Sequence, residues 1–252
     1  MRIVGFSTGR VRPKRGTRGL GRYLPGGWSD ETLPVCVFVV EHPGGLFVFD
    51  TGQSAAVTQP GFLPRWHPYL RLARFELSPE DEAAPQLRRL GFDPDAARWI
   101  VLSHMHTDHV GGLGGFPQAE IVVSRAEWIA ARGLRGRLRG YVPRQWPAGV
   151  VPRLVDFDGP EIGPFASSLD LAGDGRLVLV PTPGHAPGHV SALVRTDSET
   201  YLLAGDLAHT AAELDVVVPA VADYCRANGV VVLTAHDQEA LDRLTDSAGA
   251  RS

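Results

Sequence analysis

Short apolar runs rich in β-branched residues recur along the chain, and turn or helix signals separate them. The runs lie at residues 35–40, 46–50, 99–103, 120–124, 177–180, 201–206 and 230–234. Runs of this kind, bounded by glycine, proline or polar clusters, predict strands that are buried on both faces. The first two runs flank the sequence EHPGG, which predicts a hairpin turn. The pattern therefore predicts a sheet-based core.

Helix signals fall between several of these runs. Ser78 precedes the segment PEDEAAPQLRRLGF as a candidate N-cap, and Pro85 within this segment is expected to kink or shorten the helix. Ser124 and Glu127 have the spacing of a capping box and predict a helix that runs to about residue 133. Gly229 is expected to end a helix over VADYCRANG. This order of elements favours an α/β domain with sheets inside and helices outside.

The composition is that of an ordinary globular protein. The chain has 252 residues, of which 44% are hydrophobic and 21% charged, and its formal net charge is -3. A chain of this length can bury a sizeable core, and we expect a single domain over residues 1–252. The small negative charge makes nucleic acid an unlikely partner. The sequence contains no uninterrupted run of about eighteen apolar residues, so no membrane span is predicted.

The cysteines and the N-terminal sequence bear on the compartment. The segment MRIVGFSTGRVRPKRGTRG carries cations but no continuous apolar stretch, so no secretory signal is predicted and the cytoplasm is the expected location. The chain has 2 cysteines, Cys36 and Cys225, which lie far apart and outside any C-x-x-C spacing. Neither a disulfide framework nor a thiolate metal site is therefore predicted.

The strongest chemical signal is the sequence VLSHMHTDHVGGLGG at residues 101–115. In an extended segment, side chains two residues apart project to the same side, so His104 and His106 can share one metal ion. Asp108 and His109 follow where glycines let the chain turn into a helix, and they can address a second ion beside the first. The segment therefore predicts a metal site with nitrogen and oxygen ligands.

Further candidate ligands directly follow other predicted strands. They are His185 and His189 in TPGHAPGHV, Asp206 and His209 in LLAGDLAHT, and His236 and Asp237 in LTAHD. Layered sheet proteins gather functional loops at strand ends, so these side chains are expected to join the first cluster. Any one of them alone is more often a turn residue or a hydrogen-bonded core group. Their combination with residues 101–115 favours a site for two ions.

These motifs resemble those of the metallo-β-lactamase superfamily of dinuclear hydrolases. The resemblance rests on H-x-H-x-D-H at 104–109, on the downstream GH, GD and HD pairs, and on FDTG at 49–52, and it covers nearly the whole chain. It implies an αββα sandwich, in which two mixed β-sheets are flanked by helices and the metals lie between the sheet edges.

The resemblance also implies roles for individual residues. His104, His106 and His185 would hold the first ion, Asp108, His109 and His236 the second, and Asp206 would bridge the two. Asp50 and His189 would support these ligands through hydrogen bonds. Asp108, Asp206 and His209 are the residues expected to take part in catalysis. The cofactors would be two divalent ions, with zinc expected and iron, manganese or cobalt also compatible with these ligands.

Within the superfamily, the phrases PVCVFVVEHPGGLFVFDTG and IVLSHMHTDHVGGL look most like those of N-acyl homoserine lactonases. Those lactonases commonly carry a tyrosine three residues after the bridging aspartate, where this chain has His209. The resemblance implies that a hydroxide between the ions opens a lactone ring and that Asp206 passes a proton to the leaving oxygen. An arylester or organophosphate hydrolase, or a thioesterase of the glyoxalase II kind, is the alternative on the same site. RNA phosphodiesterase activity is a more remote alternative.

Three segments outside the motifs bear on specificity and assembly. Residues 58–75 are aromatic and aliphatic, and they either line an apolar entrance for an acyl chain or pack on the core. Residues 132–147 are rich in arginine and could cover the site, bind an anionic group or form a contact in a homodimer, or simply be solvated. The basic arm at residues 2–22 would touch RNA only in the nuclease alternative.

Overall fold

The computed structural model describes residues 1–14, 27–63 and 73–249, and in it two β-sheets pack face to face. The first sheet has the strand order β4-β1-β2-β3-β5-β6-β7. Its strands are β1 (Arg2–Pro13), β2 (Leu33–His42), β3 (Gly45–Phe49), β4 (Ala73–Glu76), β5 (Ala97–Val101), β6 (Glu120–Ser124) and β7 (Arg153–Val155). Strands β3, β5, β6 and β7 run parallel, and β4, β1, β2 and β3 pair antiparallel.

The second sheet has the strand order β12-β11-β10-β9-β8. Its strands are β8 (Leu169–Asp170), β9 (Leu177–Pro181), β10 (Val190–Arg195), β11 (Thr200–Gly205) and β12 (Val230–Thr234). The pair β11 and β12 is parallel, whereas the other neighbours are antiparallel. Both sheets are therefore mixed.

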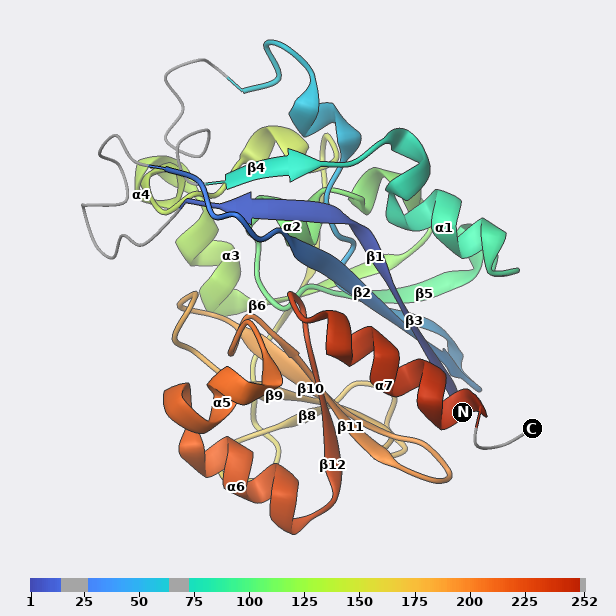
Figure 1. Ribbon diagram of the computed structural model, residues 1–252. Helices are drawn as coiled ribbons and strands as arrows, with labels where there is room; N and C mark the ends of the chain where they lie inside the picture. The colour runs from blue at the N-terminus through green and yellow to red at the C-terminus, as the bar shows by residue number, and fades with distance from the viewer. Residues whose placement is uncertain (15–26, 64–72, 250–252) are drawn as a thin grey trace.

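Helices cover the outer faces of the two sheets (Figure 1). Those beside the first sheet are α1 (Ala83–Arg89), α2 (Thr107–Val110), α3 (Arg125–Ala131) and α4 (Gly133–Leu138). Those beside the second sheet are α5 (Ala211–Val217) and α6 (Pro219–Ala227). The last helix, α7 (Gln238–Gly249), contributes Ala240 and Leu244 to the core between the sheets. The predicted αββα sandwich is confirmed.

Strand β2 shows why its sequence is apolar without alternation. Phe38 and Val40 belong to the core between the sheets, whereas Val37 and Val39 belong to the core beneath the outer helices. Successive side chains of a strand point to opposite faces, and here both faces are covered. All four side chains are at most 1% exposed. A third apolar cluster, with Leu193 and Leu202, joins the second sheet to α5 and α6.

The helix boundaries agree with the capping signals only in part. Ser78 and Asp81 form a capping box over a short 3-10 turn, and α1 begins after it with Pro85 in its first turn, so the predicted shortening by Pro85 is confirmed. Gly229 follows α6 with a φ of 62°, a conformation that glycine adopts without strain. The Ser124 hydroxyl accepts a hydrogen bond from the amide of Glu127 and caps α3, as predicted.

The basic N-terminal segment is the largest departure from the sequence prediction. Residues 2–13 form β1, which pairs with both β2 and β4 inside the first sheet, and residues 15–26 lie outside the described part of the chain. Strands β4, β7, β8 and β10 were also not predicted. Of the segment 58–75, residues 64–72 likewise lie outside the described ranges. No helix within the described ranges is long and apolar enough to cross a membrane.

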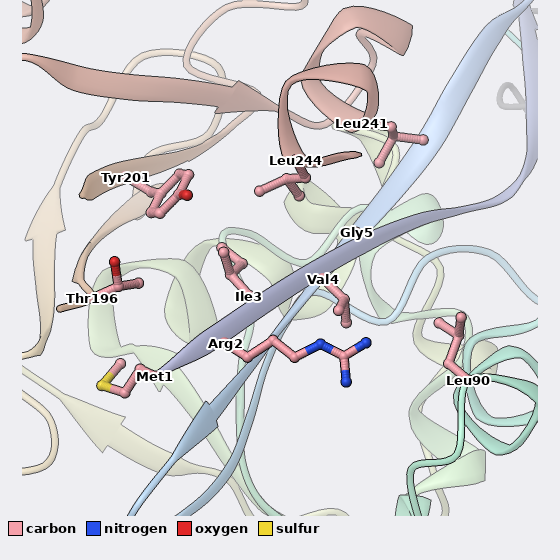
Figure 2. A pocket seen from close by; sticks show the side chains of 10 residues that line it. All are labelled: Met1, Arg2, Ile3, Val4, Gly5, Leu90, Thr196, Tyr201, Leu241 and Leu244. Carbon is pink, nitrogen blue, oxygen red and sulfur yellow. The ribbon is translucent and has the colours of Figure 1, made fainter. Parts of the chain in front are cut away.

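A cavity of about 410 Å³ lies between the start of β1 and helix α7. Figure 2 shows the side chains around it, among them Ile3, Tyr201 and Leu244. The cavity adjoins the residues at which β1 and β11 begin. None of the candidate site residues lines it, because those residues follow the opposite ends of the strands.

We expect the substitution Phe38→Ala to destabilise the protein by about 3 to 5 kcal/mol, because it empties a fully packed position between the sheets. Phe38 is 1% exposed. Val216→Ala is the control: this side chain is 83% exposed on α5, and its loss should change the free energy of unfolding by less than about 0.5 kcal/mol. Equilibrium unfolding in urea measures both. A loss below about 1 kcal/mol for Phe38→Ala would contradict the importance of this core.

Candidate metal centre

The predicted site residues gather at one end of the sandwich, where strands of both sheets finish. His104 and His106 follow β5, and Asp108 and His109 lie in α2. Asp206 comes directly after β11. The remaining candidates are His185 in the β9–β10 loop and His236 after β12. The two sheets meet here through a hydrogen bond from the amide of Val190 to the carbonyl of Ser103, at 2.8 Å.

Three imidazoles form the first group of side chains. His104 Nε2 lies 2.9 Å from His106 Nδ1, and His106 Nδ1 lies 3.0 Å from His185 Nε2. These atoms converge on one point, from loops that belong to both sheets. The group has the composition and spacing of a three-histidine metal site.

Asp108, His109 and His236 form the second group. Asp108 Oδ1 lies 4.0 Å from His109 Nε2, and Asp108 Oδ2 lies 3.8 Å from His236 Nε2. One ligand atom from each of the three residues lies within 4.8 Å of the other two. All three side chains are buried.

Asp206 stands between the two groups. Its Oδ2 lies 3.4 Å from His185 Nε2 and 3.9 Å from His104 Nε2. Its Oδ1 lies 3.4 Å from His109 Nε2 and 3.3 Å from His236 Nε2. Each carboxylate oxygen therefore faces a different group, which is the arrangement that a bridging ligand requires.

Two buried atoms at this centre lack a hydrogen-bond partner, namely His109 Nε2 and Asp206 Oδ1. A buried polar atom without a partner costs about 1 to 3 kcal/mol. A cation between these atoms would satisfy both. The donor set consists of imidazole nitrogens and carboxylate oxygens, which suits zinc and other divalent transition metals. The residues present therefore fit a pair of metal ions.

Hydrogen bonds to backbone carbonyls fix the tautomers of two imidazoles. His236 Nδ1 donates to the carbonyl of Pro34 at 2.9 Å, and His106 Nε2 donates to the carbonyl of Arg139 at 3.2 Å. Because a carbonyl only accepts, the proton must lie on these nitrogens. The other nitrogen of each ring, His236 Nε2 and His106 Nδ1, faces the cluster and is the atom available to a metal ion. Such contacts orient metal ligands and raise their basicity.

Asp50 braces the second group from behind. Its Oδ2 accepts hydrogen bonds from His109 Nδ1 and from the Ser103 hydroxyl, each at 2.8 Å, and its Oδ1 accepts from the Ser103 amide at 2.7 Å. Asp50 has a positive φ of 60°, and within the described ranges every other residue with a positive φ is a glycine. Left-handed backbone of this kind persists where the surroundings require it, often at functional sites.

His189 has no nitrogen left for a metal. Its Nε2 accepts a hydrogen bond from the amide of Asp206 at 3.0 Å, so its proton lies on Nδ1, 2.9 Å from the hydroxyl of Thr182. Gly205 has a φ of 56°, and a Cβ there would lie 2.8 Å from His189 Nε2. His189 therefore holds the backbone that presents Asp206.

Burial and charge divide the histidines into two classes. Burial lowers the pKa of His104 and His185, and it lowers that of His106 to about 4. Burial would also lower the pKa of His109 and His236, but carboxylates outweigh it. Asp50 and Asp206 raise the pKa of His109 well above its ordinary value, and Asp206 raises that of His236 to about 9. Near neutral pH, the histidines of the first group are therefore uncharged, whereas His109 and His236 are protonated.

His209 lies at the mouth of the centre. Its ring centroid is 5.9 Å from that of His236 and 6.4 Å from that of His185. Its Nδ1 is 3.3 Å from Glu213 Oε2, and the same oxygen accepts a hydrogen bond from the His209 amide at 3.1 Å. The side chain is 52% exposed, so it can meet a substrate that enters from solvent. Asp237, by contrast, accepts from the Glu239 amide at the start of α7 and lies outside both groups.

Several residues of the centre have no signal in the sequence. The carbonyls of Pro34 and Arg139 belong to segments without any metal motif, and a backbone carbonyl can come from any residue. Arg139 also shows that the arginine-rich segment 132–147 reaches the site. In the same segment, Arg144 donates to the carbonyl of Phe62 at 3.0 Å and so joins the described part of the segment 58–75 to it.

A comparison with protein families agrees with this geometry. The family model of the metallo-beta-lactamase superfamily matches residues 31–244. The chain belongs to the metallo-beta-lactamase superfamily. The match includes nearly all the strands of both sheets and every residue of the two groups.

Relatives within the metallo-beta-lactamase superfamily include N-acyl homoserine lactonases. The lactonase AttM of Rhizobium radiobacter is 34% identical over 239 residues, which cover 85% of this chain and 86% of that protein. A lactonase from a Bacillus species is 30% identical, with 74% of this chain and 69% of that protein covered. A solved N-acyl homoserine lactone hydrolase, with N-hexanoyl-L-homoserine bound at its catalytic metal center, has a TM-score of 0.73 at 21% identity and 94% coverage of both chains.

The pKa values predict that the two groups bind metal with different pH dependence. A group whose pKa is raised keeps its proton up to that pKa, so an ion must displace the proton of His236 below about pH 9. We expect the affinity of the second group to rise about 100-fold per pH unit between about pH 7 and 9, because His109 and His236 each lose a proton when the ion binds. Burial leaves the first group uncharged there, and its affinity should change by less than about threefold.

Stepwise titration of the metal-free protein with zinc, in competition with a chelating dye, measures both dissociation constants. Calorimetry in buffers of different ionisation enthalpy counts the protons released at each step. Equal pH slopes for the two steps would contradict the assignment of charge to the second group.

Proposed function

We propose that this protein hydrolyses N-acyl homoserine lactones by means of two divalent metal ions. The observation that carries the proposal is the position of Asp206, with one oxygen toward each group of ligands. The AttM lactonase, at 34% identity over 85% of the chain, supports the lactone as substrate. The first ion would be held by His104, His106 and His185, the second by Asp108, His109 and His236, with Asp206 shared between them.

When bound, two such ions supply a water activated near neutral pH and a Lewis acid for the carbonyl oxygen. The residues of the chain determine how this chemistry is used. Asp108 and Asp206 offset the positive charge, and Asp206 is placed to take the proton that the attacking water loses and pass it to the ring oxygen as the C–O bond breaks. His209, at the mouth, can donate a hydrogen bond to the substrate carbonyl. Water adds across the ester bond, and the product is the open-chain N-acyl homoserine.

We propose zinc as the native metal, because nitrogen and oxygen donors in these numbers suit it, while iron, manganese and cobalt fit the same set. We also propose that residues 1–252 act as one domain, since the ligands come from both sheets. A homodimer and a cytoplasmic location stay predictions. Leu134 and Leu138 on α4, which are 73% and 63% exposed, are the part of the arginine-rich segment suited to a subunit contact.

Incubation of the zinc-loaded protein with N-hexanoyl-homoserine lactone should give a product heavier by one water. We expect Asp206→Asn to lower kcat/KM by at least about 100-fold, because the amide loses the charge and the proton-transfer capacity of the shared carboxylate. Mass spectrometry of the product and a pH-indicator assay of acid release measure this. Absence of ring opening, together with turnover of an aryl ester, a phosphotriester or a thioester in the same panel, would assign the site to another substrate class.

His209 is the residue by which this chain differs from the usual lactonase pattern. We expect His209→Ala to lower kcat about 100-fold while two ions stay bound, because the ring meets the substrate and is not a metal ligand. Elemental analysis beside steady-state kinetics measures both quantities. His42→Ala is the control, since His42 pairs with Asp174 near the hairpin turn and touches none of the ligands. Loss of metal from His209→Ala would show that His209 is itself a ligand.

A further inference from the structure

Glu127 is a buried carboxylate that touches two ligand-bearing loops. It lies in the first turn of α3 and is 0% exposed. Its Oε1 accepts a hydrogen bond from the amide of Met105 at 2.9 Å, and its Oε2 accepts from the amide of Gly188 at 3.1 Å. Met105 stands between two histidines of the first group. Gly188 lies in the β9–β10 loop, which carries the third, so one carboxylate connects the two loops.

Ser124 completes this connection. Its hydroxyl donates to the carbonyl of Gly188 at 2.6 Å and accepts from the amide of Glu127 at 3.1 Å. Both polar backbone groups of Gly188 are thus held by the start of α3. A Cβ on Gly188 would lie 2.0 Å from the nitrogen of Glu127, so only glycine permits this approach. The start of α3 in the first sheet layer therefore clamps a loop of the second sheet.

Tyr141 brings the arginine-rich segment into the same contact. Its ring lies 4.8 Å from the ring of His106, centroid to centroid, and burial together with the nearby Glu127 carboxylate raises the pKa of its phenol. The side chain is 1% exposed. The carbonyl of Arg139 accepts from His106 Nε2 two residues earlier in the chain. Residues 139–141, which orient His106, therefore lie next to Glu127.

We propose that Glu127 is a positioning residue of the first metal group, which sets the relative placement of His104, His106 and His185. The inference rests on the proposed binding of two ions. A residue that only capped α3 would turn its carboxylate back to the amide of Ser124 in a capping box. Glu127 instead receives the backbone amides of two ligand-bearing loops. A carboxylate offers an acceptor oxygen to each of these amides, whereas a carboxamide presents an N–H₂ group that cannot accept.

The test compares Glu127→Gln with Glu82→Gln. Glu82 is the matched control, because its Oε1 also holds a loop, through the Ala55 amide at 2.8 Å and the Ser54 hydroxyl at 3.0 Å, but that loop carries no ligand. Zinc titration of the metal-free full-length protein against a chelating dye gives two dissociation constants. In Glu127→Gln, we expect one of them to rise about 10- to 100-fold and the other to stay within about twofold. Glu82→Gln should change neither.

The same zinc titration in a protein that also carries His236→Ala shows which ligand group loses affinity when Glu127 is replaced. His236→Ala removes a ligand of the second group, and the single strong site that remains should still weaken about 10-fold on Glu127→Gln. Tyr141→Phe, which removes the hydroxyl near the Glu127 carboxylate and little volume, provides a milder variant if Glu127→Gln does not fold. Tyr141→Phe should raise the zinc dissociation constant of the first group at least about threefold.

The outcomes separate this inference from the proposed function. Unchanged metal affinities in folded Glu127→Gln, or in Tyr141→Phe, would overturn the positioning role. An equal loss of both ions, or an equal effect of Glu82→Gln, would overturn it too, because it would reflect general loosening. A wild-type protein that binds two ions but opens no lactone would contradict the proposed substrate, and a selective effect of Glu127→Gln would still support the inference.

Discussion

The site depends on the electrostatic balance of one buried carboxylate. Asp206 is 8% exposed, and a buried charge without compensation costs several kcal/mol. Burial would raise its pKa, but the nearby His236 and His109 hold that pKa well below its ordinary value. The positive charge of these imidazoles compensates the carboxylate, as a divalent ion held by them would. Asp206 is therefore an ionised carboxylate before any ion binds.

The sandwich architecture follows from the need to assemble this charge balance from both sheets. The first sheet contributes the loop after β5, and the second contributes Asp206 after β11 and His236 after β12. Neither sheet supplies all three residues of either ligand group, because His185 and His236 come from the second sheet and the other ligands of the two groups from the first. The apolar layer between the sheets, with Phe38 and Leu203 at 1% and 0% exposure, holds the two halves at a constant separation. Core stability and ligand geometry are thus set by the same packing.

The residues that could be predicted from sequence are those whose signal is local. The histidine and aspartate pattern at 104–109 is one short segment, and the doubly buried strands are continuous apolar runs. Strand β1 was missed because its solvent-facing arginines, Arg2 and Arg10 among them, resemble those of a basic arm. The carbonyl of Pro34, 202 residues from its partner His236, leaves no mark in the sequence. Long-range backbone contacts of this kind become visible only when the fold is known.

Glu127 shows how one local pattern can serve two structural roles. The spacing of Ser124 and Glu127 is that of a capping box, and the serine does cap α3. The glutamate, however, is drawn to the amides of Met105 and Gly188, because those donors are buried and α3 begins close to both loops. Burial raises the pKa of Glu127, and the amide and hydroxyl donors oppose that shift. A helix start between two ligand loops can thus couple them through one side chain.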